Sequence, residues 1–319
     1  MDSLPPLLVL LFAMVITLAV FVPLTGVLVR FRANYNPKGL QLDSEGGAAP
    51  YTGPIVNSYF GMMFRVYRLE GVAGLYKGLM PTAISTFIVS AVILLALDTE
   101  KPRHGKYRAP DTGVFGTLFY SFSVLIISLP TSILTYRSIT TPHKLPYFNL
   151  VASLRILLTP TERRRPWILY LTPGLFAAES IHICIVVLFL GPLRRWLLPD
   201  LSGSTPPVNI SYVKLVTYLV ILCATVGALT PLEVIATRLA IQRNHASAQY
   251  NSVSQEVDGD AEETAEYSGT EDVIGLRNEG DPYLGLLDCA KRIINEEGWT
   301  TLYRAWWITL LGGLGSAFA

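Results

Sequence analysis

The sequence has few charged side chains. Asp, Glu, Lys and Arg make up 15% of its 319 residues, whereas soluble domains usually carry about 25%. Hydrophobic residues account for 51% of the chain and are gathered in long runs. This distribution is typical of membrane spans and argues against one large soluble core.

Cysteine and histidine are also scarce. The three cysteines, Cys184, Cys223 and Cys289, lie far apart, and the four histidines are scattered. This spacing fits neither a disulfide framework nor a metal site. A nucleophile–base constellation and a Gly-rich phosphate-binding loop are missing too. We therefore predict no enzyme activity, no metal, no cofactor and no nucleic-acid partner.

The N-terminus lacks a basic segment. Asp2 is the only charge before the apolar run from Leu4 to Pro23. A secretory signal begins with basic residues and has a shorter apolar core, and a transit peptide is rich in Arg and Ser. We interpret the run as a retained first membrane span, so any targeting signal is expected to be internal.

Five apolar runs are long enough for a helix of roughly 20 residues to cross a bilayer. They are residues 5–33, 79–97, 113–139, 168–197 and 208–241, and a sixth run, 304–319, is shorter. The runs lack the alternation of barrel strands, which favours helices. Short polar connections alternate with long ones that end in amphipathic stretches, so both termini are expected on one side and the long loops on the other.

The segment 246–281 differs from the rest of the chain. Residues 251–281 carry ten acidic side chains and one arginine, so the remaining chain is strongly basic although the net charge is only +1. The segment is rich in Ser, Gly and Glu and poor in large apolar groups, which predicts a disordered, solvated insert.

Three stretches share one pattern, in which a proline inside an apolar span is followed seven residues later by an arginine. They run from Pro23 to Arg30, from Pro130 to Arg137 and from Pro231 to Arg238, and the prolines are 107 and 101 residues apart. Such self-similarity at a fixed period indicates an internal repeat.

A second element recurs in the same register. Glu70-Gly71 is followed by Tyr76, and Glu297-Gly298 by Tyr303, with six residues from Glu to Tyr in both cases. The middle copy is weaker: Glu162 lies eleven residues before Pro173, as Glu70 lies before Pro81.

Together these motifs resemble the mitochondrial carrier family over nearly the whole chain except the acidic insert. The resemblance implies an all-α membrane protein with the mitochondrial-carrier fold: three tandem repeats, each of two membrane helices and a short amphipathic helix, in a pseudo-threefold barrel. The expected repeats are residues 1–111, 112–207 and 208–319, the last with the insert at 246–281. The resemblance also implies alternating access, with the long loops toward the matrix.

In this family an acid two residues after each proline and a base five residues after it form a ring of ion pairs that closes the matrix side. The acid positions here are Thr25, Ser132 and Glu233, and the base positions are Leu28, Thr135 and Ala236. Only Glu233 is charged, so no such ring is expected. The hydroxyls are expected to form modest hydrogen bonds across helices instead.

The gate on the opposite side uses an acid and a base near the end of each even helix. Asp98 and Lys101 keep both, Arg194 keeps only the base, and the third motif would fall beyond Ala319. The sixth helix is expected to have about 15 residues and a length of about 22 Å, which is short for a full span.

The family's substrate contacts, carried over by position, give Ser85 and Thr86 on the second span, Ala178 and Glu179 on the fourth, and a position near Gly312 on the sixth. Glu179 lies in mid-span, where an ionisable group marks a candidate functional site. His182, three residues on, can share its helix face. Two interpretations stay open: recognition of a cationic or amine-bearing solute, or a buried structural Glu–His pair.

Two functions are compatible with these residues. The first is transport of a small solute across the mitochondrial inner membrane by a monomer that contacts lipids such as cardiolipin. The second is a carrier-like protein that no longer transports and acts in the outer membrane as a scaffold or insertase, in fusion or protein insertion. The reduced gate motifs favour the second, and the mid-span acid favours the first.

Overall fold

The computed structural model describes residues 6–38, 41–42, 48–49, 53–96, 113–146, 149–198, 211–244, 266–269 and 271–318. These residues are mainly helical. Their α-helices are α1 (Pro6–Ala33), α2 (Tyr59–Leu75), α3 (Leu79–Ala96), α4 (Gly113–Thr140), α5 (Leu150–Leu157), α6 (Pro160–Arg164), α7 (Leu175–Cys184), α8 (Gly191–Leu197), α9 (Tyr212–Ile241), α10 (Leu286–Glu296) and α11 (Trp306–Phe318).

Shorter elements complete the described chain. Two 3-10 helices, η1 (Pro166–Leu171) and η5 (Trp299–Tyr303), precede α7 and α11, and a π-helical turn, η2 (Ile185–Leu190), joins α7 to α8. Two-residue strands β1 (Gln41–Leu42) and β2 (Ala48–Ala49) pair antiparallel, with Gln41 opposite Ala49. The predicted all-helical fold class therefore holds apart from this one small strand pair.

Four helical segments are long and apolar enough to span a membrane: Met14–Ala33, Gly113–Thr140, Leu175–Leu197 and Tyr212–Ile241. A fifth span results if α2 and α3, which meet at a 50° bend, count as one broken helix. Helix α11 has 13 residues, about 20 Å at 1.5 Å per residue, and is short as expected.

One predicted span begins too early. The run expected at 168–197 starts its α-helix only at Leu175, because η1 ends at Leu171 and Gly174 has φ 80°. A Cβ on Gly174 would lie 2.2 Å from the backbone nitrogen of Leu286, so this turn admits only glycine. The close approach brings the start of α7 against the start of α10.

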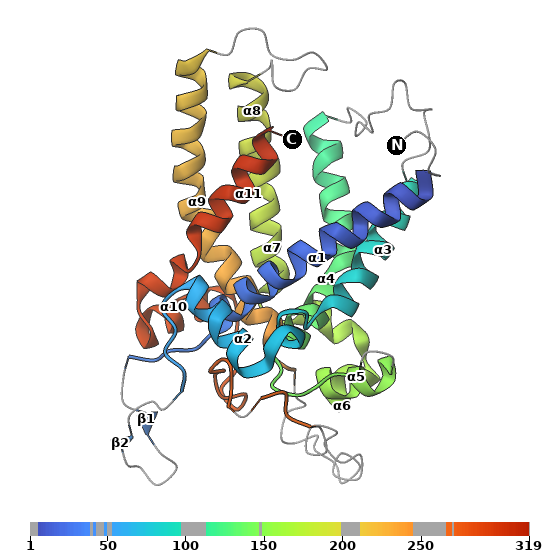
Figure 1. The fold of residues 1–319 in the computed structure, drawn as a ribbon. Helices are drawn as coiled ribbons and strands as arrows, with labels where there is room; N and C mark the ends of the chain where they lie inside the picture. Colours follow the sequence, from blue (N-terminus) through green and yellow to red (C-terminus); the bar gives the residue numbers. More distant parts are fainter. Residues whose placement is uncertain are drawn as a thin grey trace.

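The long helices form a bundle with shorter helices gathered at one end. Figure 1 shows α4, α7–α8 and α9 rising together, with α1 and α11 crossing at a tilt and α2, α5, α6 and α10 gathered below. We call that lower end the loop-side end. Helices α1, α4 and α9 contact one another in all three pairings. Their segments after Pro23, Pro130 and Pro231 become largely buried, so the three proline-containing helices converge at the loop-side end.

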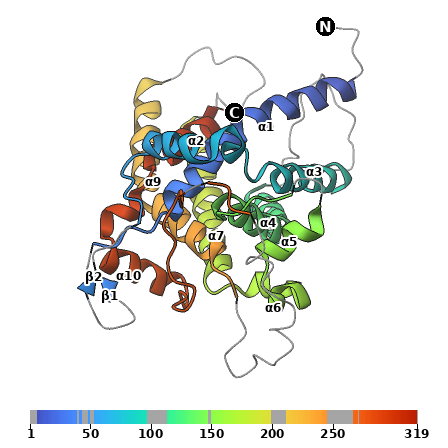
Figure 2. The ribbon, with the colours of Figure 1, turned by 60° about the horizontal axis from the view of Figure 1, so that its bottom comes forward.

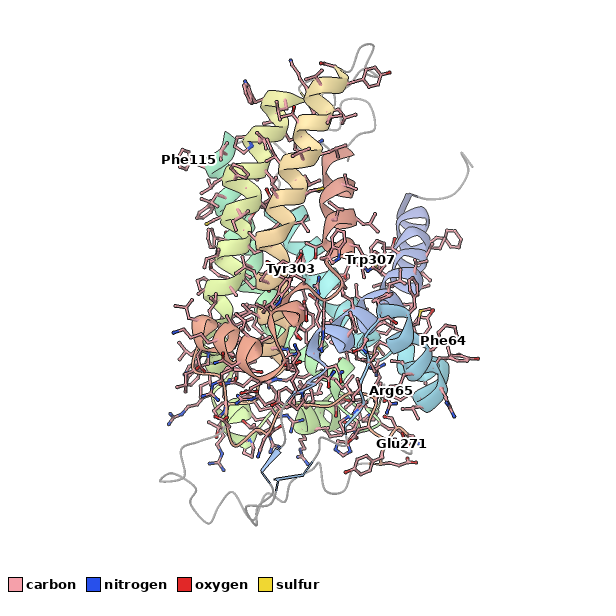
Figure 3. The ribbon with its side chains drawn as sticks, turned by 90° about the vertical axis from the view of Figure 1, so that its left-hand side faces the viewer. Phe64, Arg65, Phe115, Glu271, Tyr303 and Trp307 are labelled. Atoms are coloured by element: carbon pink, nitrogen blue, oxygen red, sulfur yellow. The ribbon has the colours of Figure 1, made fainter. Side chains whose placement is uncertain are left out.

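Large apolar side chains cover the outer surface. Phe115 on α4 is 83% exposed and Phe64 on α2 is 71% exposed, and Figure 3 shows both pointing away from the bundle. Many more aromatic and aliphatic residues on α1, α3 and α9 are exposed in the same way. A soluble monomer rarely exposes so much contiguous apolar surface, whereas lipid tails cover it without cost.

The acidic insert differs from its prediction. Residues 245–265 and 270 lie outside the described residues, but 266–269 and 271–281 are placed against the loop-side end. Val273 and Ile274 are buried in an apolar cluster with residues of α1 and α2. Local composition predicted disorder for the whole segment, and it missed this apolar pair, which anchors the second part of it.

Candidate functional site

A polar cluster joins four helices near the centre of the bundle. Its hub is Glu233 on α9, which accepts a 2.5 Å hydrogen bond from the Arg32 guanidinium on α1. The Thr309 hydroxyl on α11 donates a 2.6 Å hydrogen bond to the same carboxylate oxygen. Nε2 of His182 on α7 lies 3.4 Å from the other oxygen, a contact that is an ion pair only when the imidazole is protonated.

Arg32 was missed by sequence reasoning. The family spacing directs attention to Leu28, five residues after Pro23, and that position holds no charge. Arg32 lies four residues further on, its side chain is 8% exposed, and it also donates to Thr309 Oγ1 at 2.9 Å. The signal in the sequence that could have revealed Arg32 is its place as a second basic residue, two positions after the repeated Arg30. One inter-helix ion pair therefore exists where none was expected.

Glu179 lies one turn before His182 on α7 and is half-buried. It forms no ion pair or hydrogen bond with any residue that the structure describes, although His182 lies within electrostatic reach. The Tyr136 side chain on α4 interacts electrostatically with Glu179, Arg32 and Glu233. The imidazole thus makes its 3.4 Å contact with Glu233 and not with Glu179, which leaves an unpaired carboxylate beside a paired one.

The other predicted contact residues form no hydrogen bond with this cluster among the described residues. Ser85 Oγ on α3 is 2.9 Å from Thr131 Oγ1 on α4, and the Thr86 hydroxyl donates to Thr82 of its own helix. Ala178 is fully buried in the apolar core between α4, α7 and α9. Gly312 has open space where a Cβ would be. Ser85 therefore belongs to the α3–α4 contact, Thr86 bonds within α3, and Ala178 faces the core.

The hydroxyls at the gate positions do not bridge helices. Thr25 donates to the Phe21 carbonyl at 2.7 Å, Ser132 to Leu129 at 2.8 Å, and Thr135 to Thr131 at 2.8 Å. Each acceptor is in the same helix, so the expected cross-helix bonds are wrong. The carbonyls of Ala19 and Ile126, four residues before Pro23 and Pro130, lack their usual amide donors, and they accept 3.0 Å hydrogen bonds from the Tyr76 and Tyr170 hydroxyls instead. Asp98 and Lys101 lie outside the described residues.

A second polar layer lies at the loop-side end, where three buried ion pairs repeat. Arg30 pairs with Glu70 at 2.5 Å and Arg137 with Glu162 at 2.6 Å. Arg238 pairs with Glu297 through both carboxylate oxygens. All six side chains are at most 2% exposed.

The three arginines also close a ring. Arg30 Nε donates to the Ile139 carbonyl of α4 at 2.8 Å, and Arg137 donates to Gln242, just after α9, at 2.6 Å. Arg238 donates to the Arg32 carbonyl of α1 at 3.2 Å and to that of Asn34 at 3.0 Å. Each arginine therefore satisfies backbone acceptors at the end of the next proline-containing helix, and we call this layer the arginine ring.

The middle pair shows how the ring is held. Glu162 caps the start of α6 with Thr159 and accepts further hydrogen bonds from the backbone and side chain of Asn244. Burial opposes ionisation of this carboxyl, but the Arg137 guanidinium and the surrounding donors hold the pKa of Glu162 below its usual value. The weak sequence match of the middle copy thus corresponds to a fully formed contact.

Comparison with known proteins adds one match. A family model described as mitochondrial carrier protein matches residues 7–107 and 213–319. The comparison with curated proteins finds no match. The matched segments contain the first and third proline–arginine motifs and two of the three ring pairs.

Proposed function

The chain belongs to the mitochondrial carrier family, and we propose that it moves a small cationic or amine-bearing solute across the mitochondrial inner membrane by alternating access. Members of this family transport solutes and are not enzymes. The apolar spans agree with membrane insertion. The proposal includes three repeats, at residues 1–111, 112–207 and 208–319, and the recurrence of the Arg–Glu pair in each supports this division.

The proposal that the solute is a cation rests on the unpaired carboxylate of Glu179. An ionisable group inside a membrane costs about 2.5 to 3.5 kcal/mol on insertion scales, so it is retained where it has a polar partner or a function. Glu233 has Arg32, Thr309 and His182 as partners, whereas Glu179 has no hydrogen-bond or ion-pair partner among the described residues. A cation in the central site would supply the missing partner, with Tyr136 beside it.

Reconstitution tests this assignment. The purified protein in liposomes is offered labelled lysine, ornithine, spermidine and choline, and malate and phosphate as anions. We expect uptake of at least one cation, and Glu179→Gln should abolish it. Glu279→Gln is the matched control, because Glu279 is 52% exposed at the loop-side end and should leave uptake unchanged. Uptake of anions alone, or cation uptake that survives Glu179→Gln, would contradict the proposal.

A second candidate is a carrier-like protein of the outer membrane that acts as a scaffold or insertase. It is favoured by the gate positions, where Thr25 and Ser132 bond within their own helices and Glu233 alone is charged. Transport by alternating access normally needs a gate that closes each side in turn. A protein that does not transport needs no such gate.

Location separates the two candidates. An epitope placed in residues 251–260 is probed with protease in intact mitochondria, after the outer membrane is opened, and after the inner membrane is opened. Carbonate extraction checks membrane integration. Protection until the inner membrane is opened supports the transporter, and cleavage in intact mitochondria supports the outer-membrane candidate.

A further inference from the structure

A short segment crosses the loop-side end of the bundle between α9 and α10. We call residues 266–269 and 271–276 the strap. Figure 2 shows it as an orange-red trace that crosses the loop-side face near α2 and α4. The cluster and the ring described above use none of its side chains, yet it contacts elements from distant parts of the chain.

One end of the strap pairs with the segment after α4. The Lys144 amide donates to the Glu266 carbonyl at 2.8 Å, and the Ser268 amide donates to the Pro142 carbonyl at 2.8 Å. These bonds make an antiparallel bridge between His143 and Tyr267, whose rings lie 4.8 Å apart. The Lys144–Glu266 ion pair at this end is exposed on both sides and adds little, about 0 to 1 kcal/mol.

The other end of the strap is held by α1 and α2. Val273 and Ile274 are buried among apolar residues of both helices. Arg65 donates to the carbonyls of Asp272 and Val273 at 2.9 and 3.0 Å. It also lies 3.6 Å from Glu271, and Figure 3 shows the two side chains together at the loop-side end.

A further contact ties this end to the residues after α1. The Gly275 amide donates to Asn34 Oδ1 at 2.9 Å, and the Tyr35 amide donates to the Gly275 carbonyl at 2.8 Å. This attachment therefore combines buried apolar residues with hydrogen bonds, whereas the attachment at 142–144 includes two backbone hydrogen bonds, one ring contact and an exposed ion pair.

Under the strap lies a cavity of about 220 Å³. Arg30 and Glu70 line it on one side, with the end of α4 and the residues after it at 139–142, and the strap lines the other side. Arg30 is the ring arginine that bonds the Ile139 carbonyl. The strap thus covers the place where α1 is fastened to α4.

We propose that the strap is a latch that fastens α1 and α2 to the end of α4, and that it detaches from 142–144 when the loop-side end opens. The proposal rests on the alternating access of the proposed function. Separation of α1 from α4 stretches the strap, because it is bonded to both. The attachment that lacks the buried apolar pair Val273 and Ile274 breaks first, so the strap stays on α2.

Ser268 offers a matched pair of variants. Ser268→Pro removes the amide that donates to Pro142, whereas Ser268→Ala keeps it and removes only a hydroxyl that has no hydrogen-bond partner in the described part of the chain. Hydrogen–deuterium exchange is measured for both variants and the natural protein in lipid nanodiscs. This readout needs no knowledge of the solute.

We expect Ser268→Pro to speed exchange about fivefold in 141–145 and 266–269, the effect of losing about one net hydrogen bond, with 273–276 and α9 unchanged. Equal exchange in the two variants would overturn the proposal. Faster exchange in 273–276 as well would also overturn it, because the strap would then detach as one unit.

A disulfide tests the link to opening. His143 and Tyr267 are bridge partners, and such pairs place Cβ atoms close enough for a disulfide. With the natural cysteines replaced by serine, His143→Cys with Tyr267→Cys should stop cation uptake when oxidised and regain it with dithiothreitol, whereas His143→Cys alone stays active. Continued uptake in the oxidised form would refute the latch. Absence of uptake in the parent protein refutes the transport function, while the exchange experiment still decides the latch.

Discussion

The arginine ring and the central cluster are two polar layers of one bundle, and they differ in symmetry. The ring repeats one contact three times, with every side chain buried and every charge paired. In the cluster only Glu233 is charged among the three acid positions, and its partner Arg32 has no counterpart at the same position in the other repeats, where Ile139 and Ala240 follow nine residues after proline. The contrast indicates that the ring holds the helix ends together, while the cluster is free to differ between repeats, as our proposal that it recognises one solute requires.

Removal of one ring carboxylate should give the largest effect. In Glu297→Ala the Arg238 guanidinium stays buried without its counter-charge, and breaking a buried pair in this way costs about 3 to 5 kcal/mol. Thermal unfolding in detergent, followed by intrinsic fluorescence, measures the loss. Glu266→Ala, at an exposed pair, is the matched control and should cost at most about 1 kcal/mol. Equal losses would mean that the ring has no special structural role.

The Arg32–Glu233 pair should contribute less. Its carboxylate is 25% exposed, and hydrogen bonds to charged groups contribute about 1.5 to 3 kcal/mol. A double-mutant cycle with Arg32→Gln, Glu233→Gln and the double variant should give a coupling free energy in that range. Additive losses would show that the two side chains do not stabilise each other, and the comparison between the layers would become sharper.

Acid should weaken the ring through Glu162. Because the folded-state pKa of this carboxyl lies below its unfolded value, the stabilisation is complete above the unfolded pKa of about 4.3 and is lost as pH falls through the folded pKa. Unfolding midpoints measured from pH 6 down to pH 3 should fall more steeply for the natural protein than for Glu162→Gln. We expect a smaller effect than for Glu297→Ala, because the protonated carboxyl keeps its shape and still accepts hydrogen bonds from several neighbouring donors.

Loss of the gate hydroxyls should have the smallest effect. Thr25→Val and Ser132→Ala each remove a bond within one helix, and hydrogen bonds inside membranes average only about 0.6 kcal/mol. Unfolding midpoints of the single and double variants should therefore lie close to that of the natural protein, and the two losses should add. A large or non-additive loss of stability would indicate that these hydroxyls do form hydrogen bonds across helices.

The repeat register could be read from spacing because Pro23, Pro130 and Pro231 and the arginines that follow them recur along the chain. Glu70 and Glu297 were visible for the same reason, and Glu162 only weakly. Pairing of Arg32 with Glu233 was not visible, because the two residues are 201 positions apart and no local pattern links them. Similarly, the acidic composition of 246–281 predicted disorder, and only the packing of Val273 and Ile274 against α1 and α2 corrects it.

The sequence alone determined that the chain is a helical membrane protein with a repeated proline–arginine motif. Hydrophobic length, proline position and motif spacing are local properties, and they require no knowledge of which helices meet. Tertiary structure alone decided which carboxylate is paired and which is not, how the arginines close a ring, and where the strap lies. Those outcomes depend on the convergence of α1, α4 and α9, which brings together side chains that are distant in the chain. Inside a membrane a buried charge is retained where one of these side chains supplies its partner or where the charge serves a function.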